Sequence, residues 1–195
     1  MLGATPPRKP TNIKAKISER EKDMMQHKIV IANSGFAYSG KSTSIRYVYE
    51  LLSSRYHTNI IEPKQGYNPN QDVKAIIEIP QSDGHIVKVG IESQGDPSSR
   101  QMESIDYFVK EKCEIILVAC RVKGATKDKV LSLQPSDWQV IWFKNSIMKV
   151  DGANQSRTTP PLRTQDARLQ ERLSRDYAFY VASLIERLVL TEGII

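Results

Sequence analysis

Apolar and polar positions along this chain follow two periods that alternate with each other. Short β-branched and apolar runs, typical of strands buried on both faces, are followed by segments in which apolar residues recur at helical spacing. Strands that alternate with helices in this way indicate an α/β fold with a mostly parallel sheet. The pattern predicts strands at 28–32, 59–61, 73–79, 87–91, 114–119 and 138–143, and helices at 18–26, 42–54, 97–112, 126–133 and 164–188.

One pair of predicted strands breaks this alternation. In both 73–79 and 87–91 apolar residues occupy every second position, and Asp83-Gly84 between them favours a tight turn. We therefore expect a three-layer α/β/α domain with a mostly parallel sheet and one antiparallel hairpin.

The length of 195 residues is that of about one domain. Residues 1–12 contain three prolines, a lysine and an arginine without apolar periodicity, which predicts a flexible basic arm. We assign 13–195 to a single domain, in which the polar, proline-containing segment 151–164 is predicted to form a loop or lid.

Composition excludes several classes of protein. With 39% hydrophobic and 26% charged residues the chain can bury a core. It has no run of the roughly 18 apolar residues that a membrane span needs, and Met1–Asp23 lacks the apolar centre of a secretory signal, so we expect a cytoplasmic protein without membrane contact. Two cysteines and three scattered histidines predict neither a disulfide framework nor a zinc site. The net charge of +6 favours an anionic partner, such as a nucleotide, nucleic acid or acidic protein.

The segment after the first predicted strand carries the strongest chemical signal. Residues 35–42, GFAYSGKS, fit G-x-x-x-x-G-K-[ST] at every fixed position, between a predicted strand and a predicted helix. Glycines permit backbone angles and close approaches that side chains prevent, so the amides between them can face one hollow that receives phosphate. Lys41 can reach phosphate oxygens, the Ser42 hydroxyl can bind Mg²⁺, and the helix directs its positive end to the same place.

This segment resembles the Walker A motif of the P-loop NTPases. The resemblance implies a site for a nucleoside triphosphate with Mg²⁺, in which Gly40, Lys41, Ser42 and Thr43 make the closest contacts. The motif covers eight residues, although the strand–loop–helix order around it agrees over most of the chain. The residues expected to bind the nucleotide are Gly35, Phe36, Ala37, Tyr38, Ser39, Gly40, Lys41, Ser42, Thr43 and Gly95.

A second motif follows the predicted strand 87–91. Residues 92–96, ESQGD, are similar to the D-x-x-G element of GTPase-type members, with Glu92 in place of the usual Asp. The resemblance implies that Glu92 lies on the metal side, that Gly95 offers an amide to the γ-phosphate, and that Asp96 positions the attacking water. Glu62, which ends another predicted strand, is the rival for the metal-side acid, and Asp96 is equally suited to cap the helix after it.

The nucleotide is predicted to be ATP. A GTPase would place N-K-x-D after a late strand, whereas this chain has Phe143-Lys144-Asn145-Ser146 there. Arg121 follows the predicted central strand, at the edge where ligands of open α/β sheets bind. Its guanidinium group either binds phosphate or has a structural role. Arg157 and Arg163 in the predicted lid are candidates for an arginine that stabilises transferring phosphate.

Three functions are compatible with these motifs. The first is Mg²⁺-dependent hydrolysis of a nucleoside triphosphate, with Lys41, Glu92, Asp96 and Arg121 as the catalytic set and Ser42 and Glu92 on the metal. The second is transfer of the γ-phosphate to a nucleotide or small acceptor. The third is a nucleotide-binding interaction module with little turnover. The sequence does not fix the oligomeric state; a homo-oligomer is compatible with it, because composite sites are common in the superfamily that the motif resembles.

Overall fold

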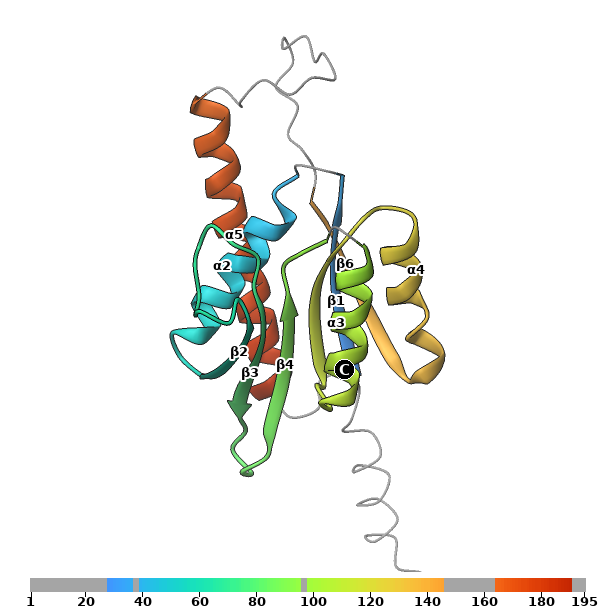
Figure 1. Ribbon diagram of the computed structural model, residues 1–195. Coiled ribbons are helices and arrows are strands. Elements are labelled where there is room, and N and C mark those ends of the chain that lie inside the picture. Colours follow the sequence, from blue (N-terminus) through green and yellow to red (C-terminus); the bar gives the residue numbers. More distant parts are fainter. Residues whose placement is uncertain (1–27, 37–38, 96–97, 146–163, 191–195) are drawn as a thin grey trace, which may run out of the picture.

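The computed structural model describes residues 28–36, 39–95, 98–145 and 164–190, which form one six-stranded sheet and four α-helices (Figure 1). The sheet order is β2-β3-β4-β5-β1-β6. The elements are β1 (Lys28–Gly35), α2 (Lys41–Ser53), β2 (His57–Glu62), β3 (Lys74–Pro80), β4 (Ile86–Glu92), α3 (Ser98–Lys110), β5 (Ile115–Cys120), α4 (Ala125–Leu131), the 3-10 turn η1 (Gln134–Ser136), β6 (Trp138–Asn145) and α5 (Thr164–Leu190).

The sheet is mostly parallel, as the sequence predicts. β1 pairs in parallel with β5 and with β6, and β4 pairs in parallel with β5. Only β3 runs the other way, antiparallel to both β2 and β4, so the predicted hairpin of β3 and β4 is confirmed. The carboxyl ends of the other five strands therefore lie at one edge of the sheet, where ligands of open α/β sheets bind.

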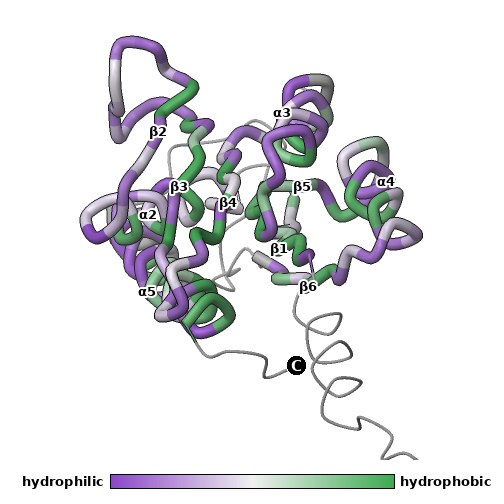
Figure 2. Tube along the Cα trace, turned by 90° about the horizontal axis from the view of Figure 1, so that it is seen from below, coloured by the Kyte–Doolittle hydropathy of each residue, from purple (hydrophilic) through white to green (hydrophobic). Residues whose placement is uncertain are grey.

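Helices cover both faces of the sheet (Figure 2). Side chains alternate along each strand, so Ile29 and Ile31 of β1 pack with α2 and α5, whereas Val30 and Ala32 pack on the opposite face with α3 and α4. Both faces of the central strands are buried, which explains why these strands read as continuous apolar runs.

Several elements are longer than predicted. β1 continues to Gly35, because Asn33 and Ser34 remain paired with β5 although they are polar. β2 begins at His57 and not at 59, since this edge strand needs apolar residues on one face only. None of the described helices combines the length and apolar character of a membrane span. The predicted arm 1–12, the helix 18–26 and all but the last residue of the lid 151–164 lie outside the described residues.

Candidate phosphate-binding site

The glycine-rich segment connects β1 to α2 at the carboxyl edge of the sheet. Gly35 is the last residue of β1, and Gly40 precedes the first residue of α2. Gly40 has φ 81° and ψ 10°, a left-handed conformation in which a Cβ is unfavourable. Its carbonyl accepts the first bond of the helix, from the Ser44 amide at 2.9 Å. Ala37 and Tyr38 lie outside the described residues.

Lys41, the first residue of α2, folds back over this segment. Its Nζ donates a hydrogen bond of 2.6 Å to the Phe36 carbonyl oxygen. The first turn of α2 contains no acidic residue, so the positive end of the helix dipole is not offset there. Ser42 and Thr43 follow in this turn and are half-buried. The arrangement places a cation, a helix N-terminus and a hydroxyl around one segment, which is suited to bind a polyphosphate.

Residues that the sequence analysis did not select support this segment. Asn33 is fully buried in β1; its Nδ2 donates to the Lys41 carbonyl at 3.4 Å, and its Oδ1 has no hydrogen-bond partner among the described residues. On α5, Gln170 Nε2 donates to the Ser39 carbonyl oxygen at 3.4 Å. Asn33 could have been noticed as a polar residue extending an apolar run, whereas nothing in the sequence marks Gln170.

The start of α5 packs directly against Gly40. A Cβ at Gly40 would lie 2.8 Å from Nε2 of Gln170 and 3.2 Å from Oγ of Ser174. We expect Gly40→Ala to lower the free energy of unfolding by about 1–2 kcal/mol from backbone strain, measured by urea titration. The contact itself should add little, because the atoms that the methyl group meets are the ends of the Gln170 and Ser174 side chains, which can rotate away.

Gly84→Ala is the matched control for this substitution. Gly84 has φ +88°, close to the +81° of Gly40, but no atom would approach its added methyl group within 4 Å. The two variants should therefore lose similar stability, and a clearly larger loss for Gly40→Ala would show that the Gln170 and Ser174 side chains cannot move aside.

Glu92 ends β4 and points into the core between the sheet and α3. It is fully buried and accepts hydrogen bonds from Ser104 Oγ at 2.6 Å and from the Gln94 amide at 2.8 Å. Arg100 Nε lies 3.5 Å from its carboxylate. Burial raises the pKa of Glu92, although the hydrogen bonds and the positive charges of Arg100 and Lys74 act in the opposite direction.

The strand order separates Glu92 from the glycine-rich segment. Glu92 pairs with Val118 of β5, and Val118 pairs with Ala32 of β1. Two strand spacings, about 10 Å, therefore lie between the backbones of Glu92 and Ala32. The contacts given above for Glu92 are with α3 and with the turn after β4, so its carboxylate would reach a metal ion held by Ser42 only indirectly, through water.

Glu92→Gln is expected to change how stability depends on pH. Because the pKa of the native carboxyl is raised above 4.5, the native state binds the proton more tightly than the unfolded chain. The stability contributed by Glu92 therefore falls as pH rises from 4.5 through the native pKa, whereas glutamine does not titrate. We expect the stability of the variant relative to the unsubstituted protein to increase over this pH range, measured by urea unfolding.

Glu103→Gln removes an exposed carboxylate from α3, the helix that packs against Glu92, and serves as the matched substitution. A difference between Glu92→Gln and the unsubstituted protein that stays constant with pH would contradict the raised pKa of Glu92.

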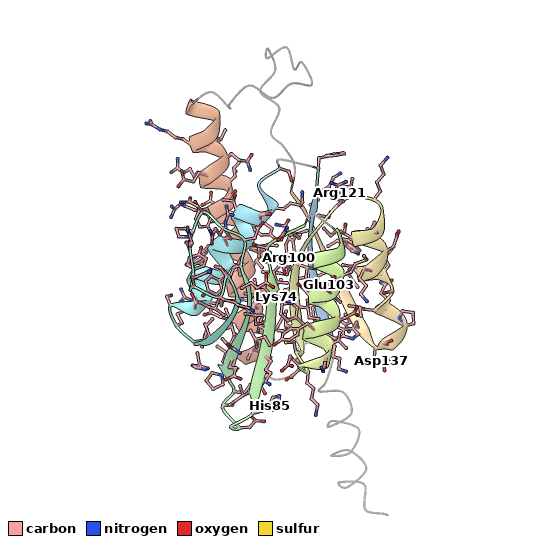
Figure 3. The ribbon with its side chains drawn as sticks, viewed as in Figure 1. Lys74, His85, Arg100, Glu103, Arg121 and Asp137 are labelled. Atoms are coloured by element: carbon pink, nitrogen blue, oxygen red, sulfur yellow. The ribbon has the colours of Figure 1, made fainter. Side chains whose placement is uncertain are left out.

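Two other candidates, Gly95 and Arg121, lie at the same edge of the sheet. Gly95 is buried against the end of β5, where its Cβ would lie 3.4 Å from that of Ala119. Arg121 follows β5; its side chain is exposed, and its amide donates to Thr126 Oγ1 at 2.9 Å (Figure 3). Thr126 is thus not the N-cap of α4, a position that Gly124 takes. Asp96 lies outside the described residues.

An acidic residue absent from the sequence prediction is linked to the start of α2. Asp72 Oδ1 accepts a hydrogen bond from Ser93 Oγ at 2.8 Å and lies 3.9 Å from Nη1 of Arg46. Arg46 in turn donates through Nη2 to Thr43 Oγ1 at 3.2 Å. Asp72 was missed because it belongs to an irregular segment without periodicity, and only the folded chain brings it near α2.

A cleft of about 580 Å³ lies beside this link. It is formed by the end of β2, the segment that leads to β3, the turn after β4 and the first turns of α3. Glu62, the rival for the metal-side acid, is in the wall of the cleft and pairs with Arg100 Nη2 at 3.0 Å. The lining residues are Glu62, Pro63, Lys64, Gln65, Asn70, Gln71, Asp72, Gln94 and Arg100.

No protein-family model, curated protein or solved structure matches this chain. Within the described residues, no three His, Cys, Asp or Glu side chains come together as a metal-binding group. Both cysteines, Cys113 and Cys120, are buried free thiols. The segment between β1 and α2 and the cleft are therefore the features whose chemistry indicates a function.

Proposed function

We propose that this protein is a P-loop NTPase with a three-layer α/β/α domain that binds a nucleoside triphosphate, ATP, with Mg²⁺ and hydrolyses it. The observation that carries the proposal is the junction of β1 and α2. There Gly40 is left-handed and the Lys41 ammonium lies 2.6 Å from a carbonyl oxygen of the same segment, within a sequence that fits G-x-x-x-x-G-K-S. Hereafter residues 35–42 are called the phosphate loop.

The proposed chemistry is mainly electrostatic. When the nucleotide binds, Lys41 Nζ gives up its hydrogen bond to the Phe36 carbonyl and bonds phosphate oxygens instead. Its charge then offsets the negative charge that develops on the leaving group. Amides of the phosphate loop and the N-terminus of α2 hold the phosphates in place. Water attacks the γ-phosphorus, and the bond from this phosphorus to the β–γ bridging oxygen breaks. Arg121 is exposed at the same sheet edge and is proposed to contact phosphate.

The available donors fit Mg²⁺ in kind, because a hard cation prefers hydroxyl and carboxylate oxygens. Ser42 would hold the metal directly, and Glu92 would act through water. The protein thus offers Mg²⁺ few ligands, and the described residues contain no acidic cluster that could take the place of the phosphate oxygens as metal ligands. We therefore expect the metal to bind together with the nucleotide. When bound, Mg²⁺ neutralises phosphate charge and orients the phosphates.

The metal-side acid can be tested with two substitutions. Glu92→Gln is expected to weaken Mg²⁺-dependent binding of a non-hydrolysable ATP analogue by about tenfold, because outer ligands typically contribute 10–100-fold to affinity. Glu62→Gln should leave this affinity unchanged. Isothermal titration at several Mg²⁺ concentrations measures both, and weaker binding by Glu62→Gln alone would transfer the role to Glu62.

The enzyme class is tested by measuring the products. Phosphate released from ATP and Mg²⁺ without any added acceptor supports hydrolysis, and a panel of nucleotides tests the preference for ATP. Tight binding without turnover would instead support an interaction module. One observation favours phosphotransfer as a second candidate, namely the polar cleft that is lined by Asp72 and opens at the same edge of the sheet as the phosphate loop. The cleft is large enough for a small acceptor.

A further inference from the structure

The cleft has the size and position of a second-substrate site. Its volume of about 580 Å³ lies within the range of small-molecule sites. It opens at the carboxyl ends of β2 and β4, and this edge of the sheet also carries the phosphate loop. Pro63 is the single apolar residue among those lining it, so the cleft does not favour an apolar ligand or an aromatic ring.

The charges around the cleft balance. Two acidic residues, Glu62 and Asp72, face two basic residues, Lys64 and Arg100. Arg100 is close to both Glu62, at 3.0 Å, and the buried Glu92, at 3.5 Å, so its charge is already compensated. A strongly anionic ligand would therefore gain little here. The remaining polar lining consists of the amides of Gln65, Asn70, Gln71 and Gln94. Amides and carboxylates together suit a ligand with many hydroxyl groups.

Asp72 connects this cleft to the first turn of α2, which follows the phosphate loop. Its hydrogen bond with Ser93 and its ion pair with Arg46 both use Oδ1, and its side chain is 30% exposed. The Ser93 hydroxyl also accepts from the Val73 amide at 2.9 Å, which fixes the position of the hydroxyl that Asp72 binds. Since Arg46 contacts Thr43, the Asp72 carboxylate is held between the cleft and the first turn of α2.

We propose that the cleft binds a neutral polyhydroxy compound, a sugar or polyol, as the acceptor of the γ-phosphate, with Asp72 as the general base. This rests on the proposed cleavage of ATP at the phosphate loop. The acceptor hydroxyl oxygen forms a bond to the γ-phosphorus while the bond from this phosphorus to the β–γ bridging oxygen breaks. The hydroxyl proton passes to Asp72, and ADP leaves with the electron pair of the broken bond.

The test measures ADP formation from ATP and Mg²⁺ in the presence of ribose, glucose, myo-inositol or glycerol, with inorganic phosphate measured in parallel. We expect at least one compound to increase ADP formation without a matching increase in phosphate, and ³¹P NMR to show a phosphomonoester. If ATP is hydrolysed but no compound is phosphorylated, the acceptor site is wrong while the hydrolase proposal stands. If Lys41→Ala also hydrolyses ATP normally, the hydrolase proposal fails independently.

Asp72→Asn should lower the acceptor-dependent kcat by about 100-fold or more, with a smaller change in KM for the acceptor, because general-base catalysis contributes 10²–10⁴-fold. Gln71→Trp, which places a large side chain in the cleft wall, should raise the KM for the acceptor. Asp137→Asn is the matched control with both constants unchanged. Asp137 precedes β6, toward the opposite edge of the sheet, and its φ of 63° is tolerated by asparagine (Figure 3).

Two results would overturn the assignment. Full acceptor-dependent kcat in Asp72→Asn would remove Asp72 as the base. An unchanged acceptor KM in Gln71→Trp would show that the acceptor binds outside the cleft, even if Asp72→Asn should fail to fold.

Discussion

Lys41→Ala is expected to reduce turnover of ATP by at least about 100-fold, because loss of a single positioned donor to transition-state charge costs 10²–10³-fold. The nucleotide-free protein should lose little stability. The Nζ of Lys41 donates a hydrogen bond to the Phe36 carbonyl at a partly exposed position, and such bonds contribute about 1 kcal/mol. Steady-state release of phosphate and a thermal melt of the apo protein measure the two effects.

Lys127→Ala is the matched control for this prediction. Lys127 also lies in the first turn of a helix, α4, at the same edge of the sheet, with its Nζ 5.9 Å from the centre of the Trp142 ring. Because it is not part of the phosphate loop, its removal should leave turnover within about twofold. Normal activity in Lys41→Ala, or equal losses in the two variants, would remove the phosphate-loop assignment.

Gly90→Ala is expected to lower the free energy of unfolding by about 2–3 kcal/mol or more. Gly90 lies in β4 beneath α3, and an added Cβ would lie 2.5, 2.7 and 2.9 Å from three ring carbons of the fully buried Phe108. The ring cannot move aside without disturbing the packed face of α3. Alanine in place of glycine otherwise favours a strand by about 0.5–1 kcal/mol, so a loss would come from the contact itself. Urea unfolding measures it.

A double-mutant cycle tests the origin of this loss. Phe108→Ala should be destabilising by about 3–5 kcal/mol because it leaves a cavity. In that background Gly90→Ala should cost little or become favourable, because the ring that obstructs the methyl group is gone. Additive losses would mean that the close approach of β4 and α3 does not determine the need for glycine.

The sequence predicts most of the fold because the relevant signals are local. The apolar run at 28–32 and the helical spacing in 42–54 correspond to β1 and α2, and the spacing of the glycines locates the phosphate loop between them. Strand alternation also predicts the direction of Glu92. Since Val89 and Ile91 face α2 and α5, the next side chain, Glu92, faces the side of α3.

The order of strands could not be predicted in the same way. The pairing of strands depends on contacts between segments that are distant in the sequence, and the residues of β5 do not by themselves indicate that it lies between β1 and β4. This order places Glu92 two strands from β1, a separation that the motif alone does not reveal. Asp72 was missed for a related reason, because its neighbours Arg46 and Ser93 come from two other parts of the chain.

The packing of Gln170 and Ser174 against Gly40 has a consequence for how the molecule responds to its ligand. A ligand that fixes the backbone of Ser39 and Gly40 also favours the docked position of the beginning of α5. The coupling free energy acts equally in both directions, so packing of α5 against the phosphate loop also strengthens binding of the ligand. The first turns of α5 should therefore exchange their amide hydrogens more slowly when nucleotide is bound.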